Sequence, residues 1–356
     1  MSKATKSRRA VVSNATINDV AKLAGVSIKT VSRVINLEPN VRDATKEKVD
    51  KAIAELNYRP NQSARNLASH RTHLIVLIYD DPSAYFLPSA GYIIKLQQGA
   101  LRACHSTNYE LLIHPCNYRE KDVGDGLRTL AEQIRPSGIV LAAPLSNMQK
   151  IVRAIAATGT PFVPVSPGKK SKGLFTVSTN DREISAEMTR YLASLGHTRI
   201  AFITGHPRHK AVANRFLGYQ DGLEQCGLTF SKRLVMAGDN SLKSGEVAAA
   251  RLLDRKLAPT AIFAANDDMA AGVIRVADRL GIKIPEQLSV AGCDDITLAQ
   301  QVYPALTTIR QPLARMAEHA TMALINKVQH GSSLTGTEVI AGELQLRGST
   351  GPAPVS

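Results

Sequence analysis

The segment that most constrains this chain is residues 16–36, TINDVAKLAGVSIKTVSRVIN, which predicts two short helices joined by a tight turn. Val20, Leu23 and Ala24 recur at helical spacing and give the first helix an apolar face. Gly25 follows them, where the chain needs a non-helical backbone that glycine adopts readily. Two helices joined in this way are typical of a helix-turn-helix, which lays its second helix in the DNA major groove.

The ends of these two helices carry residues that suit this motif. Thr16 is expected to cap the first helix, and Asp19 places a favourable negative charge in its first turn. Val26 is expected to fill the angle between the helices, and Ser27 to cap the second one. The side chains expected to face inward from the second helix are Val31, Val34 and Ile35.

The outer face of the second helix is left with four side chains, Ile28, Lys29, Ser32 and Arg33. Two cations, a hydroxyl and an apolar group suit the phosphates, base-edge acceptors and thymine methyl groups of a duplex. An ordinary solvated helical hairpin is the alternative, but it does not explain why turn, caps and cationic face coincide. We therefore expect a DNA-binding surface here.

The net charge of +14 over 356 residues indicates a polyanionic partner, and its distribution is uneven. Residues 1–73 hold 14 Lys and Arg against 6 Asp and Glu, so they carry +8 of the excess. Residues 1–15 are expected to form a disordered basic arm, which either contacts phosphates or is a solvated tail.

A third helix is expected over residues 45–57, with Thr45 as its capping candidate. Its buried face would consist of Val49, Ile53 and Leu56. The three helices make a small head over residues 16–59. Pro60 ends the third helix, and residues 60–73 are expected to form a hinge helix and linker. That helix is too short to be stable alone in water, so we expect it to order on a surface.

From residue 74 onward, apolar strands alternate with helices in two successive rounds, which predicts an α/β architecture with parallel sheets. The expected strands are 74–81, 109–115, 138–144, 161–167, 199–205, 233–239, 261–267 and 288–295, and the alternation restarts after residues 175–181. The carboxyl ends of parallel strands lie along one edge of each sheet, where ligands bind. Two sheets with facing edges would enclose a cleft.

Polar residues gather at these strand ends, as expected of a site for a small polar ligand. They are Asp80, Asp81, residues 144–147, His206, residues 266–268, Asp294 and Asp295. An acid at a strand end also caps the helix that follows. For Asp267 and Asp295, capping and ligand contact remain equally open.

Missing motifs exclude several classes of protein. The chain has no GxSxG, no GxGxxG after a strand and no HExxH, so we expect neither an enzyme nor a metal or cofactor site. Its four scattered cysteines fit reduced thiols rather than disulfides or a zinc site. It shows no export signal and no 18-residue apolar stretch, so we expect a cytoplasmic protein without a membrane partner.

Residues 16–68 closely resemble the head of the lactose-repressor/galactose-repressor (LacI/GalR) family of bacterial transcription regulators. The likeness continues through LGHTRIAFITG, NRFLGY, AANDDMAAG, LSVAGCDD, YPALTTIRQP and ELQLRGST. It implies an all-α helix-turn-helix head and an α/β two-lobed, periplasmic-binding-protein-like effector domain over residues 74–350. The implied lobes are discontinuous, with about 74–176 and 306–340 in the first, about 177–305 and 341–350 in the second, and a tail at 351–356.

The resemblance also implies roles in DNA binding. Base reading falls on Ile28, Lys29 and Arg33 of the second helix. Phosphate-contacting or orienting roles fall on Thr16, Ser27, Ser32, Asn36 and Thr45. Leu67 matches the hinge leucine that inserts into the minor groove and unstacks a base step. The alternatives are an ordinary surface charge for Arg33 and a packing residue for Leu67.

Effector contacts are implied for side chains that combine hydrogen-bond donors and acceptors, namely Arg215, Asn266, Asp294, Ser146, Asp80 and His206. Such a set holds vicinal hydroxyls or the edge of a nucleobase. A buried ion pair with a strand-end acid is the alternative role for Arg215. Sugar-binding members of the family often carry a stacking aromatic residue where this chain has Asn240, so Tyr85, Phe86 or Tyr303 would have to supply the ring.

Together these features predict a repressor that reads a pseudo-palindromic double-stranded DNA operator and responds to a small-molecule effector. No leucine heptads follow the effector domain, so a homodimer is expected rather than a tetramer. A sugar or glycoside is the expected effector, and a nucleobase or nucleoside is the alternative. A solute-binding protein for transport would share the two lobes, but the head and the missing export signal oppose it.

Overall fold

The computed structural model of the chain describes residues 15–35, 41–58, 72–80, 91–168, 173–254 and 259–355. The chain divides into two compact units, Met1–Thr72 and His73–Ser356. Asn36, Leu67 and nearly all of the expected basic arm and hinge lie outside the described residues. The same holds for Asp81, Tyr85 and Phe86.

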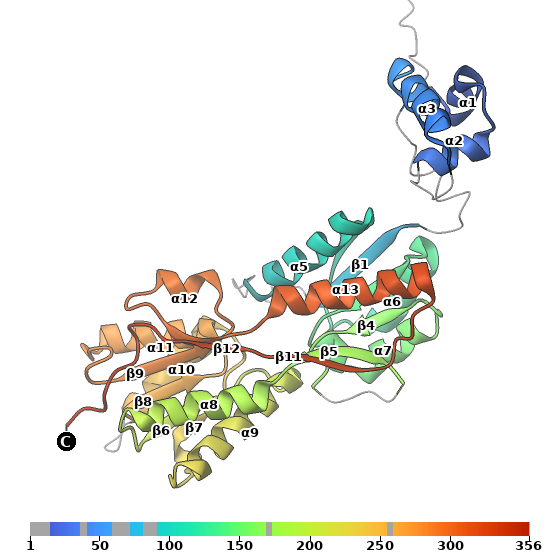
Figure 1. Cartoon of the computed structure of the whole chain (residues 1–356). Coiled ribbons are helices and arrows are strands. Elements are labelled where there is room, and N and C mark those ends of the chain that lie inside the picture. The colour runs from blue at the N-terminus through green and yellow to red at the C-terminus, as the bar shows by residue number, and fades with distance from the viewer. Residues whose placement is uncertain are drawn as a thin grey trace, which may run out of the picture. The chain divides into compact units, whose positions relative to one another are not determined.

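The first unit contains the three expected helices, α1 (Ile17–Ala24), α2 (Ile28–Ile35) and α3 (Asp43–Glu55) (Figure 1). Thr16 and Asp19 cap α1 reciprocally: Thr16 N donates to Asp19 Oδ2 at 2.8 Å, and Asp19 N donates to Thr16 Oγ1 at 3.4 Å. Gly25 follows with a left-handed φ of 65°, so the turn has the predicted backbone. Ser27 Oγ accepts from Thr30 N at 3.1 Å, which confirms the predicted cap on α2.

Two expectations for the head were wrong. Leu23 is 46% exposed, and Ala21 takes the buried place beside Val20 because the apolar face of α1 is rotated by part of a turn. Thr45 does not cap the third helix, because α3 begins at Asp43 and Thr45 already lies in its first turn. Val20, Val31, Val34 and Val49 are buried as expected, whereas Ile35, Ile53 and Leu56 are only partly buried and Ala52 joins the core in their place.

The first lobe of the larger unit is a parallel four-stranded sheet in the order β2-β1-β3-β4. Its strands are β1 (Leu74–Asp80), β2 (Glu110–Cys116), β3 (Gly138–Leu141) and β4 (Phe162–Pro164). One face packs against α5 (Gly91–Thr107) and α13 (Leu313–His330). The other face packs against α6 (Val123–Ile134) and α7 (Gln149–Ala156) (Figure 1).

The second lobe is a six-stranded sheet in the order β12-β10-β9-β8-β6-β7, parallel except where β12 joins β10. Its strands are β6 (Ile200–Ile203), β7 (Val235–Met236), β8 (Ala261–Ala264), β9 (Ser289–Cys293), β10 (Thr307–Arg310) and β12 (Glu343–Gln345). Its helices are α8 (Asp181–Ser194), α9 (Lys210–Gln225), α10 (Leu242–Leu253), α11 (Asp267–Arg279) and α12 (Thr297–Gln301). The described strands thus form the two successive α/β rounds that the sequence predicts.

The chain passes between the lobes after β5 (Phe175–Thr179), after β10 and after β11 (Gly336–Ile340). β5 and β11 pair in parallel and lie side by side in Figure 1. The crossing expected near residue 306 comes a few residues later, because β10 pairs with β9 and therefore belongs to the second lobe. Among the described residues, no helix has the length and apolar character that crossing a bilayer requires.

Candidate ligand cleft and nucleic-acid interface

A cavity of about 340 Å³ lies between the two lobes, at the small end of the range of about 300–1,000 Å³ for small-molecule sites. Its polar lining comes from both lobes: Asp80, Tyr92, Tyr118, Arg119, Ser166, His206, His209, Arg215, Asp239, Asn240, Asn266, Asp268 and Asp294. Five of the six residues expected to contact the effector are thus brought together. No cluster of acids, histidines or cysteines suited to a metal ion occurs among residues that the structure describes.

Arg215, from α9, is buried at the cavity wall and held by three partners. Its Nε lies 2.9 Å from Asp181 Oδ1, and its Nη1 lies 3.6 Å from Asp294 Oδ1. Nη1 also donates to the carbonyl oxygen of Ala265 at 2.6 Å. Both interpretations of Arg215 therefore apply, since it forms buried ion pairs and also lines the cavity.

Asp294 follows β9 and brings a carboxylate to the same wall. Gln311, which follows β10, donates an amide hydrogen bond to Asp294 Oδ1. Burial raises the pKa of Asp294 to about 6, although the nearby guanidinium of Arg215 opposes the shift. Sequence reasoning missed Gln311, because its role depends on the pairing of β10 with β9.

Asn266 is fixed by two hydrogen bonds that leave it at the cavity surface. Its Oδ1 accepts from Met269 N at 3.1 Å and so caps α11, and its Nδ2 donates to Asn240 O at 2.9 Å. Asn240, in turn, has a left-handed φ of 72°, and its Oδ1 accepts from His206 N at 3.2 Å. Asn240 therefore lines the cavity with an amide group, at the position where sugar-binding members of the family often carry a stacking aromatic ring.

Neither Asp267 nor Asp295 caps a helix or lines the cavity. Asp267 is fully buried and accepts hydrogen bonds from Ile296 N at 2.9 Å and from Thr308 Oγ1 at 2.5 Å. Asp295 lies 2.7 Å from Arg310 Nε and also pairs with Arg347. Both acids therefore join segments within the second lobe, and neither alternative that the sequence left open applies to them.

Ser146 was wrongly placed at the site. It is buried in the short 3₁₀ helix Leu145–Asn147, and its hydroxyl donates to Val165 O at 2.9 Å, so it bonds within the first lobe. Tyr303 is 94% exposed and does not line the cavity either. Asp80 and His206 do line it, as expected.

Aromatic rings reach the cavity from positions that the sequence did not single out. Tyr92 lies in the first turn of α5, and Tyr118 follows β2; both line the cavity from the first lobe. His209 lines it from the second lobe, where burial, His206 and Arg215 lower its pKa to about 3. His209 therefore presents a neutral imidazole. Tyr118 and His209 each follow a strand at the carboxyl edge, which is the signal that could have found them.

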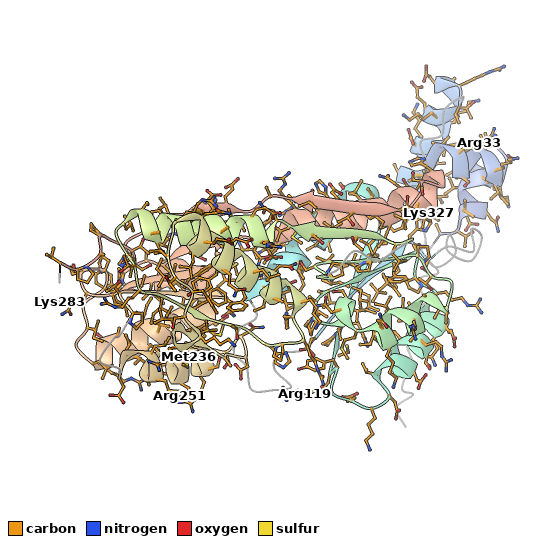
Figure 2. All side chains as sticks on the ribbon, turned by 90° about the horizontal axis from the view of Figure 1, so that it is seen from below. Arg33, Arg119, Met236, Arg251, Lys283 and Lys327 are labelled. Atoms are coloured by element: carbon orange, nitrogen blue, oxygen red, sulfur yellow. The ribbon has the colours of Figure 1, made fainter. Side chains whose placement is uncertain are left out.

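The head presents the predicted outer face. Ile28 is 50% exposed, Lys29 and Arg33 are exposed, and Ser32 is half-buried. Figure 2 shows Arg33 on the surface of the helical unit. The side chains of Thr16 and Ser27 cap the two helices that carry this surface, and their phosphate contacts stay a prediction.

Two family models match this chain. Residues 16–61 match the bacterial regulatory proteins of the lacI family, and residues 189–350 match the periplasmic binding protein-like domain. Among curated relatives, the HTH-type transcriptional regulator DegA of Bacillus subtilis is 35% identical, covering 95% of this chain and 98% of its own. The ribose operon repressor of Escherichia coli is 34% identical, with 88% and 93% covered. The transcriptional repressor PurR of Vibrio atlanticus is 33% identical, with 88% and 92% covered.

Solved structures agree with these relatives. The lac repressor dimer bound to operator and the anti-inducer ONPF superposes with a TM-score of 0.78 at 25% identity, covering 95% of this chain and 100% of that one. A complex of the transcriptional regulator CelR with cellobiose has a TM-score of 0.73 at 28% identity, with 94% and 99% covered.

Proposed function

This chain belongs to the LacI/GalR family of bacterial DNA-binding transcription regulators, and we propose that it is a repressor controlled by a sugar or glycoside bound between its lobes. Its relatives are transcription regulators and not enzymes. The proposal therefore concerns the ligand and the way in which the ligand changes DNA affinity.

The observation that carries the proposal is the arrangement of Arg215, Asn266 and Asp294 around one cavity. The planar guanidinium donates, the carboxylate accepts and the amide does both, so adjacent hydroxyl groups find a partner for each oxygen. The ion pairs of Arg215 hold these groups in place before a ligand arrives, which reduces the entropy lost on binding.

The names of two related proteins support a carbohydrate as the effector. The ribose operon repressor shares 34% of its aligned residues with this chain, and CelR was solved with cellobiose. A nucleobase or nucleoside is the second candidate, and one observation favours it: the rings of Tyr92 and Tyr118 line the cavity and offer flat surfaces to a planar base.

We propose that two copies act together. Two heads related by a two-fold axis would read the halves of a pseudo-palindromic operator, with Lys29 and Arg33 facing base edges. The ligand changes operator affinity only if it binds one arrangement of the lobes more tightly than another. The insertion of Leu67 into the minor groove remains a prediction.

The test begins with selection of an operator from a randomised duplex library by the full chain. Operator affinity is then measured while sugars, glycosides, nucleobases and nucleosides are added one at a time. We expect one carbohydrate to change the Kd for operator by roughly 5- to 150-fold, the usual range of allosteric coupling. A change produced only by a nucleobase or nucleoside would replace the proposed ligand with the second candidate.

The same selection tests the reading surface. Lys29→Ala should relax the preference at one base position in each half-site, because Lys29 is exposed on the outer face of α2. The loss should correspond to about 1–3 kcal/mol of discrimination at that position. Lys48→Ala, on the exposed side of α3, serves as the control and should leave the selected sequence unchanged.

A further inference from the structure

The two lobes are connected by the chain along one side of the cavity and by side chains along the other. The crossover strands β5 and β11 run along the upper side of the lobes in Figure 2, and Arg119 lies at the lower side. A pair of lobes joined in this way opens on the side away from its crossovers. The contacts near Arg119 are therefore the ones that opening would break.

Tyr118 forms the centre of those contacts. It follows β2 in the first lobe, is 6% exposed, and faces the loop between β6 and α9 of the second lobe. Its hydroxyl lies 3.3 Å from His206 Nε2, and the guanidinium carbon of Arg208 lies 4.7 Å from the centre of its ring. The second contact has the geometry of a cation–π interaction.

A second connection reaches the same loop. Asn147, which follows β3 in the first lobe, donates from Nδ2 to Arg208 O at 3.4 Å. Two separate loops of the first lobe therefore hold one loop of the second lobe, at its backbone and at its side chains.

That loop is itself braced. His206 N donates to Asn240 Oδ1 at 3.2 Å, and Arg208 N donates to His206 Nδ1 at 3.2 Å. Because Nδ1 accepts, a neutral His206 carries its proton on Nε2 and donates it to the Tyr118 hydroxyl. Burial, Arg119 and Arg208 lower the pKa of His206, while Asp239 opposes them, so the neutral form is the one expected near pH 7.

The braced loop is continuous with the ligand site. His206 and His209 line the cavity, and α9, which begins one residue later, carries Arg215. Tyr118 also lines it from the opposite lobe. A ligand in the cavity thus contacts the same two loops that hold the lobes together.

We propose that Tyr118, Asn147, His206 and Arg208 form an interlobe clasp that keeps the cleft closed in the ligand-free protein and regulates access to the effector site. This inference rests on the proposed function in one respect, namely the identity of the ligand that enters the cleft. Closure by the clasp is a property of the ligand-free chain and is measured without an effector.

The test measures the distance between the lobes in the ligand-free full chain by double electron–electron resonance. One spin label is attached to the naturally exposed Cys226 of the second lobe and one to Glu132→Cys on α6 of the first lobe. Cys116→Ser is present in every sample, and labelled chains are diluted with unlabelled ones so that only distances within a chain are seen. The variants are Arg208→Ala and Tyr118→Phe.

We expect Arg208→Ala to shift the distance distribution to longer values and to raise the ratio of open to closed lobes by roughly two- to tenfold, the size of a lost cation–π contact. Tyr118→Phe keeps the ring and loses the bond between the lobes to His206 Nε2, together with the bond from Arg119 Nε within the first lobe, so its shift should be smaller. Lys232→Ala is the matched control, because Lys232 is an exposed residue of the second lobe that takes no part in the clasp. Its distance distribution should be the same as that of the unsubstituted chain.

Arg208 is exposed, so its removal leaves the core of the lobe intact and the result interpretable. If the distance distributions of Arg208→Ala and Tyr118→Phe both coincide with that of the unsubstituted chain, the proposed clasp is wrong. That outcome would leave the proposed carbohydrate response untouched, because the response is measured by operator affinity.

Discussion

The reading surface of the head and the ligand cleft between the lobes are built in opposite ways. The outer face of α2 comes from one short stretch of chain, and its caps and turn lie within the same stretch. The cleft draws its lining from Asp80 through Asp294 and is held together by bonds between distant segments. The head therefore depends on local propensity, whereas the cleft depends on the tertiary fold.

Removing Arg215 should damage the cleft most. Arg215→Ala leaves the buried carboxylates of Asp181 and Asp294 without their cation, and breaking such a pair costs about 3–5 kcal/mol. The free energy of unfolding of the larger unit, measured by urea denaturation of the full chain, should fall by that amount. In the head, the protection of the α1 amides against hydrogen exchange should stay unchanged.

Arg182→Ala provides the control, because Arg182 pairs with Asp221 on the exposed surface and such pairs contribute at most about 1 kcal/mol. Equal losses for the two variants would mean that the ion pairs of Arg215 do not hold the cleft together, and the contrast between cleft and head would fail.

Acid should destabilise the cleft through His209. The pKa of His209 is about 3 in the folded chain, against 6.5 for an unperturbed histidine, so below pH 6.5 the unfolded chain binds a proton that the folded chain does not. Stability is thus lost as the pH falls through that window. Between pH 6.5 and 5, the unsubstituted chain should lose about 1–2 kcal/mol more than His209→Gln.

The raised pKa of Asp294 acts in the opposite direction, because the folded chain then binds its proton first. Asp294 is present in both proteins, so the difference between them isolates His209. Parallel pH profiles for the two chains would show that His209 is not held neutral in the cavity.

The smallest expected effect lies in the head. Thr16→Ala removes the cap of α1, which stabilises a helix by about 1 kcal/mol. Hydrogen exchange at the α1 amides should accelerate about fivefold in the full chain, the factor that corresponds to this free energy. Unfolding of the larger unit should not change, and a loss there would show that the two units are less independent than their folds indicate.

The sequence predicted the head well because its signals are short-range. Thr16, Gly25 and Ser27 act on neighbours a few residues away, and all three do what was expected. The errors at Leu23 and Thr45 are shifts within a helix, where propensity does not fix the start or the rotation.

Apart from Arg215 on α9, which the family resemblance indicated, the cleft was predicted only where a residue ends a strand. Asp80, His206 and Asn266 were found in this way, but Gln311 was not, because its approach to Asp294 depends on the pairing of β10 with β9. Ser146 shows the converse: it follows a strand of the correct sheet, yet its hydroxyl bonds to Val165 O and does not line the cavity. Strand ends therefore identify the edge, and the pairing decides which side chains face the ligand.

The most direct test of a ligand-controlled repressor is an operator titration with the carbohydrate found in the panel, repeated with Asp294→Asn. Asparagine keeps the size of Asp294 but removes the charged acceptor that the carboxylate offers to ligand hydroxyl groups, so operator binding should persist while the response to the carbohydrate is lost. An undiminished response in this variant would contradict the account, because the ligand would then act from somewhere other than the cleft.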